Sequence, residues 1–114
     1  MTQGHSHKGD NYFVSPWNFL PEVMEGWNFP PQVKFHDVTL RDGEQQAGVV
    51  FNKDDKIRIA RMLDEAGIHR IEAGMPAVSP DDAAAIEYLA KADLNADIYS
   101  FSRCMVEDLS LIHI

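Results

Sequence analysis

The sequence predicts an α/β fold in which parallel strands alternate with crossover helices. Three short apolar runs with strand character, at residues 33–40, 68–73 and 96–102, are separated by two amphipathic helical patterns. This spacing leaves room for one helix between successive strands, which is the arrangement of a right-handed parallel crossover. With 45% hydrophobic and 25% charged residues, the 114-residue chain has the composition of a globular protein. Its length suits one small domain or a piece of a larger one.

Both helical patterns carry clear end signals. The first helix is expected to begin after Asn52, whose side chain can cap the N-terminus, and to end before Gly67. The second is expected to begin at Ser79-Pro80, where a capping serine precedes a proline and two aspartates that favour the helix dipole. The apolar stripe of the first helix contains Ile59, Ala60, Leu63 and Ala66. Its basic residues are expected on the solvated side: Lys53, Lys56, Arg58 and Arg61.

Four segments of different character are predicted along the chain. Residues 1–10 are polar, which is typical of a flexible tail. Residues 11–32 are rich in aromatic residues and proline, so we expect an arm without regular secondary structure that packs on the globular body or on a second subunit. Residues 33–108 contain the α/β pattern. Residues 109–114 match a translation of a common sequencing adapter, so authentic sequence is expected to end near residue 108.

Composition argues against several classes of function. The net charge of −8 disfavours binding to nucleic acid and to anionic membrane surfaces. No apolar run reaches the roughly 18 residues of a spanning helix, and the N-terminus lacks the apolar core of a signal peptide. The single cysteine, Cys104, suits a reducing compartment, so a cytoplasmic protein is expected. There is no glycine-rich phosphate loop to suggest nucleotide binding.

The most informative segment is Asp37–Gln45, which reads as the end of a strand followed by a cluster of charge. Alternation along this strand would place Thr39 and Arg41 on one side of the sheet and Leu40 on the other. Arg41 and Asp42 follow the last apolar residue, so they are expected at the edge where parallel strands deliver side chains to a pocket. A carboxylate there can hold a metal ion, and a guanidinium can stabilise an oxyanion.

Glu72, near the end of the second predicted strand, is the next candidate. The carboxyl ends of parallel strands share one edge, so Glu72 and Arg103 are expected on the same side as Asp42. A carboxylate between two apolar strand residues needs a partner, and Arg41 is the obvious one. The alternative is an ion pair with a purely structural role.

The remaining polar residues suggest little chemistry. His36 and His69 lie in or beside strands, where a lone histidine is more often structural than a ligand. Cys104 has no base nearby in sequence, which argues against a catalytic thiol. Glu44 is expected to be a surface or loop acid.

These motifs resemble a known family. Residues 37–45, together with Ile71–Pro76 and residues 79–80, are similar to the 2-isopropylmalate, homocitrate and citramalate synthases. Those enzymes belong to a superfamily of metal-dependent barrels with an Asp-Arg-Glu signature, the HMG-CoA lyase-like or pyruvate carboxyltransferase domain. The resemblance implies that residues 33–108 are the N-terminal portion, about three β/α units, of a TIM (β/α)8 barrel. The motifs favour isopropylmalate or citramalate synthases, although Met75 stands where phenylalanine is common.

The resemblance also implies an activity and its site residues. The activity is that of an acyltransferase: a Claisen-type condensation of acetyl-CoA with a 2-oxo acid and then thioester hydrolysis, in a homodimer that uses a divalent metal ion (magnesium, manganese or zinc). Asp42 would be a metal ligand, and Arg41 would bind substrate and stabilise negative charge on its oxygen. Glu72 would complete the signature and hold Arg41, while Gln45 would lie near the substrate. Arginine suits this role because it cannot lose its charge.

Two other functions stay open at this point. The first is a carbon–carbon lyase or aldolase of the same superfamily. The second is a non-enzymatic interaction module with an aromatic docking arm, which would predict an authentic stop codon close to residue 108. The sequence does not name the 2-oxo acid of a condensing enzyme. A full barrel needs about 250 residues, and the pair of histidines that supplies further metal ligands in the family is absent from this chain. The fragment alone is therefore expected to be inactive and poorly soluble.

Overall fold

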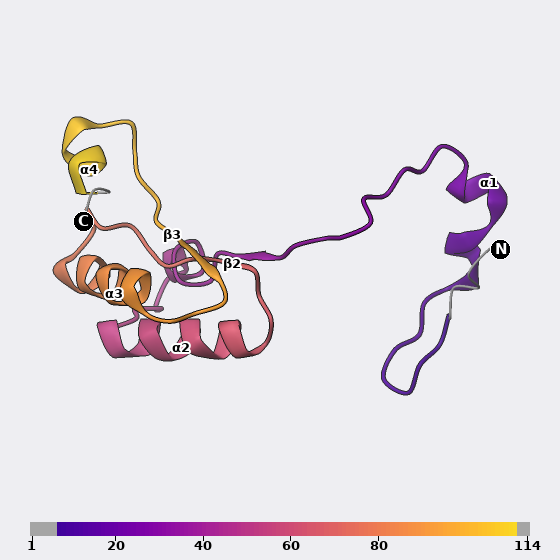
Figure 1. Cartoon of the computed structure of the whole chain (residues 1–114), viewed down its shortest axis with the longest axis horizontal. Helices are drawn as coiled ribbons and strands as arrows, with labels where there is room; N and C mark the ends of the chain where they lie inside the picture. Colours follow the sequence, from indigo (N-terminus) through magenta and orange to yellow (C-terminus); the bar gives the residue numbers. More distant parts are fainter. Residues whose placement is uncertain (1–6, 112–114) are drawn as a thin grey trace. The chain divides into compact units, whose positions relative to one another are not determined.

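The computed structural model describes residues 7–111, which form two units that meet in sequence between Gln32 and Val33 (Figure 1). Parts of the predicted N-terminal tail (residues 1–6) and of the adapter-like end (residues 112–114) lie outside the described residues. Among the residues that are described, no helix has both the length and the apolar character that a membrane crossing requires.

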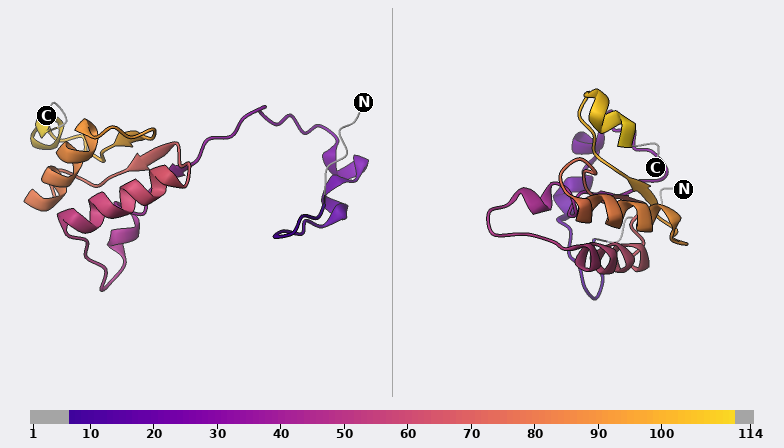
Figure 2. Two further views of the ribbon diagram at one scale, coloured as in Figure 1. Left: turned by 60° about the horizontal axis from the view of Figure 1, so that its bottom comes forward. Right: turned by 90° about the vertical axis from the view of Figure 1, so that its left-hand side faces the viewer.

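The second unit contains a parallel sheet of three strands in the order β1-β2-β3. Asp37 of β1 pairs with Ile71 of β2, which in turn pairs with Ile98 of β3. One long helix connects each pair of strands, which confirms the predicted parallel crossovers, and α2 and α3 pack side by side (Figure 2). The elements of this unit are β1 (His36–Asp37), η2 (Gly43–Gln45), α2 (Lys53–Glu65), β2 (Arg70–Glu72), α3 (Pro80–Lys91), β3 (Asp97–Tyr99) and α4 (Val106–Ser110).

The predicted ends of the two long helices are confirmed. The Asn52 side chain accepts a hydrogen bond from the Asp55 amide, and the Asp55 side chain accepts one from the Asn52 amide, so a reciprocal capping box begins α2. Gly67 adopts a positive φ of 83° just after α2, a conformation that glycine tolerates best. Ser79 caps α3 by accepting a hydrogen bond from Asp82, and proline occupies the start of the helix.

The hydrophobic core joins the sheet to α2 and α3. Leu40, Ile71 and Leu89 are completely buried and come from three different parts of the unit. Each such side chain stabilises the fold by about 1.5–3 kcal/mol through the apolar surface that it removes from water. The buried members of the cluster are Leu40, Ala60, Ile71, Ala73, Ile86, Leu89 and Ala96.

Substitution of Ile71 tests this core. We expect Ile71→Ala to lower the free energy of unfolding by about 2–5 kcal/mol, because it leaves a cavity at the centre of the sheet. Val50→Ala is the matched control, since Val50 is 84% exposed and its truncation should change the free energy by less than about 0.5 kcal/mol. Urea unfolding of the two variants measures the difference, and equal effects would contradict the assignment of the core.

The first strand is much shorter than the predicted 33–40, because a turn interrupts it. The Asp37 carboxylate accepts hydrogen bonds from the backbone amide and the hydroxyl of Thr39, at 2.9 and 3.1 Å. The Val38 carbonyl then accepts the amides of Arg41, Asp42 and Gly43. Local side-chain bonds of this kind compete with a strand ladder. The predicted alternation of side chains therefore does not extend beyond Asp37, and Arg41 lies in a turn.

The other two strands are also shorter than predicted, at 70–72 instead of 68–73 and at 97–99 instead of 96–102. Backbone pairing continues past their ends, since the Ala73 amide donates to Tyr99 and the Phe101 amide donates to Gly74. These two bonds hold the segments after β2 and β3 together at the edge where the polar residues lie.

The first unit contains short helical turns, so the prediction that residues 11–32 have no regular element is wrong. The turns are η1 (Pro16–Phe19) and α1 (Pro21–Met24), and each begins with a proline. Proline is compatible with a first helical position because it has no amide hydrogen to satisfy there and its φ is already helical. Trp27 and Phe29 stack edge to face at 5.0 Å.

A candidate active site at the ends of β1 and β2

Arg41 and Glu72 form a two-point ion pair between the turn after β1 and the end of β2. Arg41 Nε lies 2.9 Å from Glu72 Oε1, and Arg41 Nη2 lies 3.1 Å from Glu72 Oε2. The Glu72 side chain is 12% exposed and that of Arg41 is 23% exposed, so the pair is partly withdrawn from water. This geometry fixes the plane of the guanidinium. The predicted pairing of these two residues is confirmed.

Three neighbours determine the electrostatics of Arg41. The hydrogen bond to Glu72 raises the pKa of Arg41, burial opposes this increase, and attraction to Glu72 and Asp42 adds to it. The guanidinium also lies 4.9 Å from the centre of the Phe101 ring, a cation–π distance. His36 Nε2 lies 3.8 Å from Glu72 Oε2. Arg41 is therefore a permanently charged donor with a fixed orientation.

Asp42 stands beside this pair and faces solvent. Its carboxylate is 57% exposed, and Oδ1 accepts a hydrogen bond from Arg41 Nη1 at 3.0 Å. An exposed carboxylate is a hard oxygen donor of the kind that magnesium and manganese prefer. Within residues 7–111, no group of three or more histidine, cysteine, aspartate or glutamate side chains is placed to hold a metal ion. The chemistry of the Asp42 carboxylate is compatible with a single bond to a divalent cation.

Gln45 and Arg41 line a common pocket of about 170 Å³. Gln45 follows Asp42 by one turn of η2, since its amide donates to the Asp42 carbonyl at 3.1 Å. The pocket combines charged and apolar walls. It is lined by Arg41, Glu44, Gln45, Met75, Val78, Asp82 and Phe101.

Two residues of this region differ from the sequence prediction. Lys56 is completely buried and does not lie on the solvated side of α2. Glu44 is not a free loop acid, because its Oε2 atom lies 2.6 Å from Lys56 Nζ and its Oε1 atom accepts the Phe51 amide at 2.8 Å. The sequence carried a signal for Lys56: it precedes Ala60 by four residues and Leu63 by seven, so it lies on the apolar stripe.

Arg103 does not join the candidate site, although it follows β3. Its Nε and Nη2 atoms lie 2.7 and 2.9 Å from the carboxylate of Asp108, at the start of α4. His69 is structural, as predicted, because its Nδ1 atom accepts the Phe35 amide. The candidate site therefore draws on the segment after β1, the end of β2 and the loop that follows it, Asp82 of α3 and Phe101.

The Arg103–Asp108 ion pair predicts how the stability of the fold depends on pH. The Arg103 hydrogen bond lowers the pKa of Asp108 below its ordinary value. The pair should therefore contribute stability above the unfolded pKa of about 3.9 and lose it as the pH falls through the lower folded pKa. An NMR titration of the Asp108 carboxyl carbon should give a midpoint below the ordinary value, and Arg103→Met should raise it. An unchanged midpoint in that variant would contradict the pairing.

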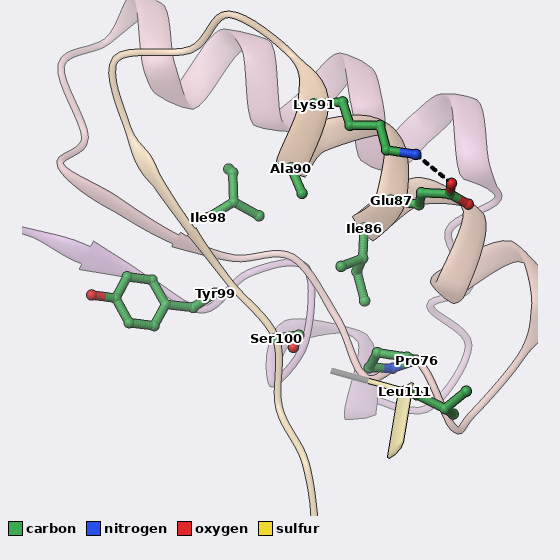
Figure 3. Close-up of a pocket in the computed structure, with 9 residues that line it drawn as sticks. All are labelled: Pro76, Ile86, Glu87, Ala90, Lys91, Ile98, Tyr99, Ser100 and Leu111. Atoms are coloured by element: carbon green, nitrogen blue, oxygen red, sulfur yellow. Dashed lines mark hydrogen bonds and ion pairs between the residues drawn. The ribbon is translucent and has the colours of Figure 1, made fainter. Parts of the chain in front are cut away.

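A larger pocket, of about 410 Å³, lies apart from Arg41 and Glu72, between α3, β3 and the end of α4 (Figure 3). Its walls include Ile86 and Ile98, and the charged residues at its edge, Glu87 and Lys91, are paired with each other at 2.6 Å. Figure 3 shows that this pair spans one turn of α3. The rest of the lining is mixed, with Ala90 and Pro76 beside the polar residues Tyr99 and Ser100.

Comparison with known proteins identifies the family. The chain is 43% identical, over 86% of its length, to a homocitrate synthase AksA of Methanothermobacter thermautotrophicus, of which it covers 24%. It is 49% identical, over 64% of its length, to a 2-isopropylmalate synthase 2 of Caldanaerobacter subterraneus, of which it covers 19%. The chain thus spans a quarter or less of the length of these relatives. The sequence model of the HMGL-like family matches residues 32–112, so the chain belongs to the HMGL-like family, and its parallel β/α units are part of the TIM-barrel fold that the resemblance implied.

Proposed function

We propose that this chain is the N-terminal part of a metal-dependent acyltransferase that condenses acetyl-CoA with a 2-oxo acid. The observation that carries the proposal is the Arg41 guanidinium, which a buried Glu72 holds at two points beside an exposed Asp42 carboxylate. The names of the relatives support a synthase. A cytoplasmic homodimer is part of the same proposal.

Each residue of the site has a chemical task in this reaction. Asp42 would be one ligand of a divalent cation, which polarises the ketone of a bound 2-oxo acid. Arg41 offers a fixed positive donor to the oxygen on which negative charge develops, and its orientation requires no rearrangement during the reaction. Glu72 is a positioning residue because it acts through Arg41. Gln45, on the rim of the same pocket, can donate a hydrogen bond to a substrate carboxylate.

The test is a thiol-release assay on the full-length protein whose reading frame contains this chain. Acetyl-CoA is incubated with a divalent cation and a panel of 2-oxo acids, and free CoA is measured with a thiol reagent. We expect release that depends on both the 2-oxo acid and the cation. Cleavage of a 3-hydroxyacyl-CoA or a hydroxy acid without condensation would instead assign the lyase or aldolase alternative. Absence of both reactions would refute the proposal.

A further inference from the structure

We infer that Lys56 is a positioning residue for the proposed condensation, because its buried ammonium joins the loop that carries Arg41 to the loop after β2. The expected effect on kcat rests on the proposed function. The joining of the two loops rests only on the geometry of the described residues. Lys56 belongs to α2 and has no exposed surface. It lies behind the 170 Å³ pocket, where both Glu44 and Asp82 are lining residues.

The first attachment is to the loop after β1. Lys56 Nζ donates to the Leu40 carbonyl at 3.0 Å, one residue before Arg41. It also donates to Glu44 Oε2 at 2.6 Å, two residues after Asp42. Glu44 in turn accepts the Phe51 amide through its second oxygen at 2.8 Å. Both sides of the Arg41-Asp42 pair are therefore tied to α2.

The second attachment is to the loop after β2. Lys56 Nζ lies 2.8 Å from Asp82 Oδ1, and Asp82 Oδ2 accepts the Met75 amide at 3.1 Å. Gly74 allows this close approach, since a Cβ atom there would lie 2.8 Å from Asp82 Oδ2 and 3.2 Å from Lys56 Nζ. The φ of Gly74, 143°, is one that other residues rarely adopt.

The network returns to Arg41 by a second path. The Gly74 carbonyl accepts the Phe101 amide at 2.9 Å, and the Phe101 ring lies against the Arg41 guanidinium. Lys56 thus contacts the peptide before Arg41 directly and influences the ring beside Arg41 through the loop after β2. A shift of either loop would change the distance between Arg41 and a substrate in the pocket.

Stability alone does not account for this arrangement. Replacing a buried ionic network with apolar side chains of similar volume is often neutral or stabilising. An ammonium held by two hydrogen bonds and an ion pair instead specifies one arrangement of the groups that it joins. The partners of Lys56 are the Leu40 carbonyl and Glu44, both in the segment after β1, and Asp82 in the first turn of α3, and none of them belongs to a strand. Two of these three residues, Glu44 and Asp82, line the pocket, so the bonds fix part of its wall.

The test compares Lys56→Met with Arg58→Met in the full-length protein. Arg58 is exposed on the same helix, so its variant removes the same charge outside the network. We expect Lys56→Met to lower kcat about 10²-fold, as a misplacement of about 1 Å can, with KM for the 2-oxo acid changed less than about threefold. The Arg58 variant should keep the wild-type values. A wild-type kcat per folded Lys56→Met enzyme would overturn the inference.

Hydrogen exchange followed by mass spectrometry separates positioning from a general loss of stability. In Lys56→Met, peptides that contain Phe51 and Met75 should exchange faster, because their amides bond to Glu44 and Asp82. Peptides that contain Ile71 and Ile98 should exchange as in the wild type. Faster exchange throughout the unit would mean a structural role and would also overturn the inference.

A milder variant covers the case in which Lys56→Met does not fold. Glu44→Gln keeps the size of the side chain but has one carbonyl oxygen in place of two carboxylate oxygens, so it cannot accept from both Lys56 and the Phe51 amide as Glu44 does. We expect a partial fall in kcat and a smaller loss of stability than in Lys56→Met. A folded Glu44→Gln enzyme with wild-type kcat and wild-type exchange would refute the inference.

If the wild type shows no condensation at all, the proposed function fails, but the exchange experiment still tests the two attachments.

Discussion

Replacement of Arg41 with lysine is expected to lower the kcat of the proposed condensation by about 10²–10³-fold. Lysine keeps the positive charge but offers a single ammonium, which cannot reproduce the Nε–Oε1 and Nη2–Oε2 contacts with Glu72. The charge would then no longer be held in one orientation toward the pocket. Steady-state kinetics of thiol release by the full-length protein measure the effect.

The matched control for this substitution is Arg61→Lys. Arg61 is an exposed residue of α2 whose Nη2 atom donates to the Tyr88 hydroxyl at 2.9 Å, away from the pocket. Its conversion should leave kcat and KM unchanged. If Arg41→Lys retains a kcat within about threefold of the wild type, a fixed guanidinium is not required, and the ion pair with Glu72 has the structural role considered as the alternative.

Replacement of Asp42 with asparagine is expected to weaken binding of a divalent cation about 10²-fold or more, because the cation loses a charged ligand. The carboxylate is exposed, so the change should not unfold the protein. Isothermal titration calorimetry of the full-length protein with manganese measures the affinity directly, independently of catalysis. Chelation of the cation should abolish thiol release by the wild type, and readdition should restore it.

Asp54→Asn is the control for the metal experiment. Asp54 is an exposed residue in the first turn of α2, and its substitution removes the same charge at a position away from the candidate site. Cation affinity in this variant should match that of the wild type. Equal affinities for Asp42→Asn and the wild type would exclude Asp42 as a ligand and leave Arg41, Glu72 and Gln45 as the remaining predicted site residues.

The sequence predicted most of the local structure because the decisive signals are local. Asn52, Ser79 and Gly67 mark the helix ends by their own backbone and side-chain chemistry, which does not depend on distant contacts. The pairing of Arg41 with Glu72 was also predictable, since a carboxylate in a buried strand needs a cationic partner. The roles of Arg41, Asp42, Glu72 and Gln45 in catalysis stay predictions.

The errors arose where a long-range or competing interaction decides the outcome. Asp37 ends the first strand by bonding to Thr39, and an alternating apolar pattern does not reveal that competition. The charge of Lys56 predicts a position in solvent, whereas its spacing places it on the apolar stripe. Its acceptors, Glu44 and Asp82, are distant in sequence and meet only after the two loops have formed.

The residues that line the 170 Å³ pocket differ in how much their substitution would disturb the surrounding structure. Glu44 and Asp82 are tied to Lys56, so a substitution at either position disturbs the segments that Lys56 joins. The side chains of Met75 and Val78 line the pocket but take no part in that network. Substitutions at these two positions would change the size of the pocket while Arg41 stays in place. Under the proposed function, substitutions at residues 75 and 78 are therefore expected to change which 2-oxo acid the pocket admits while the reaction stays the same.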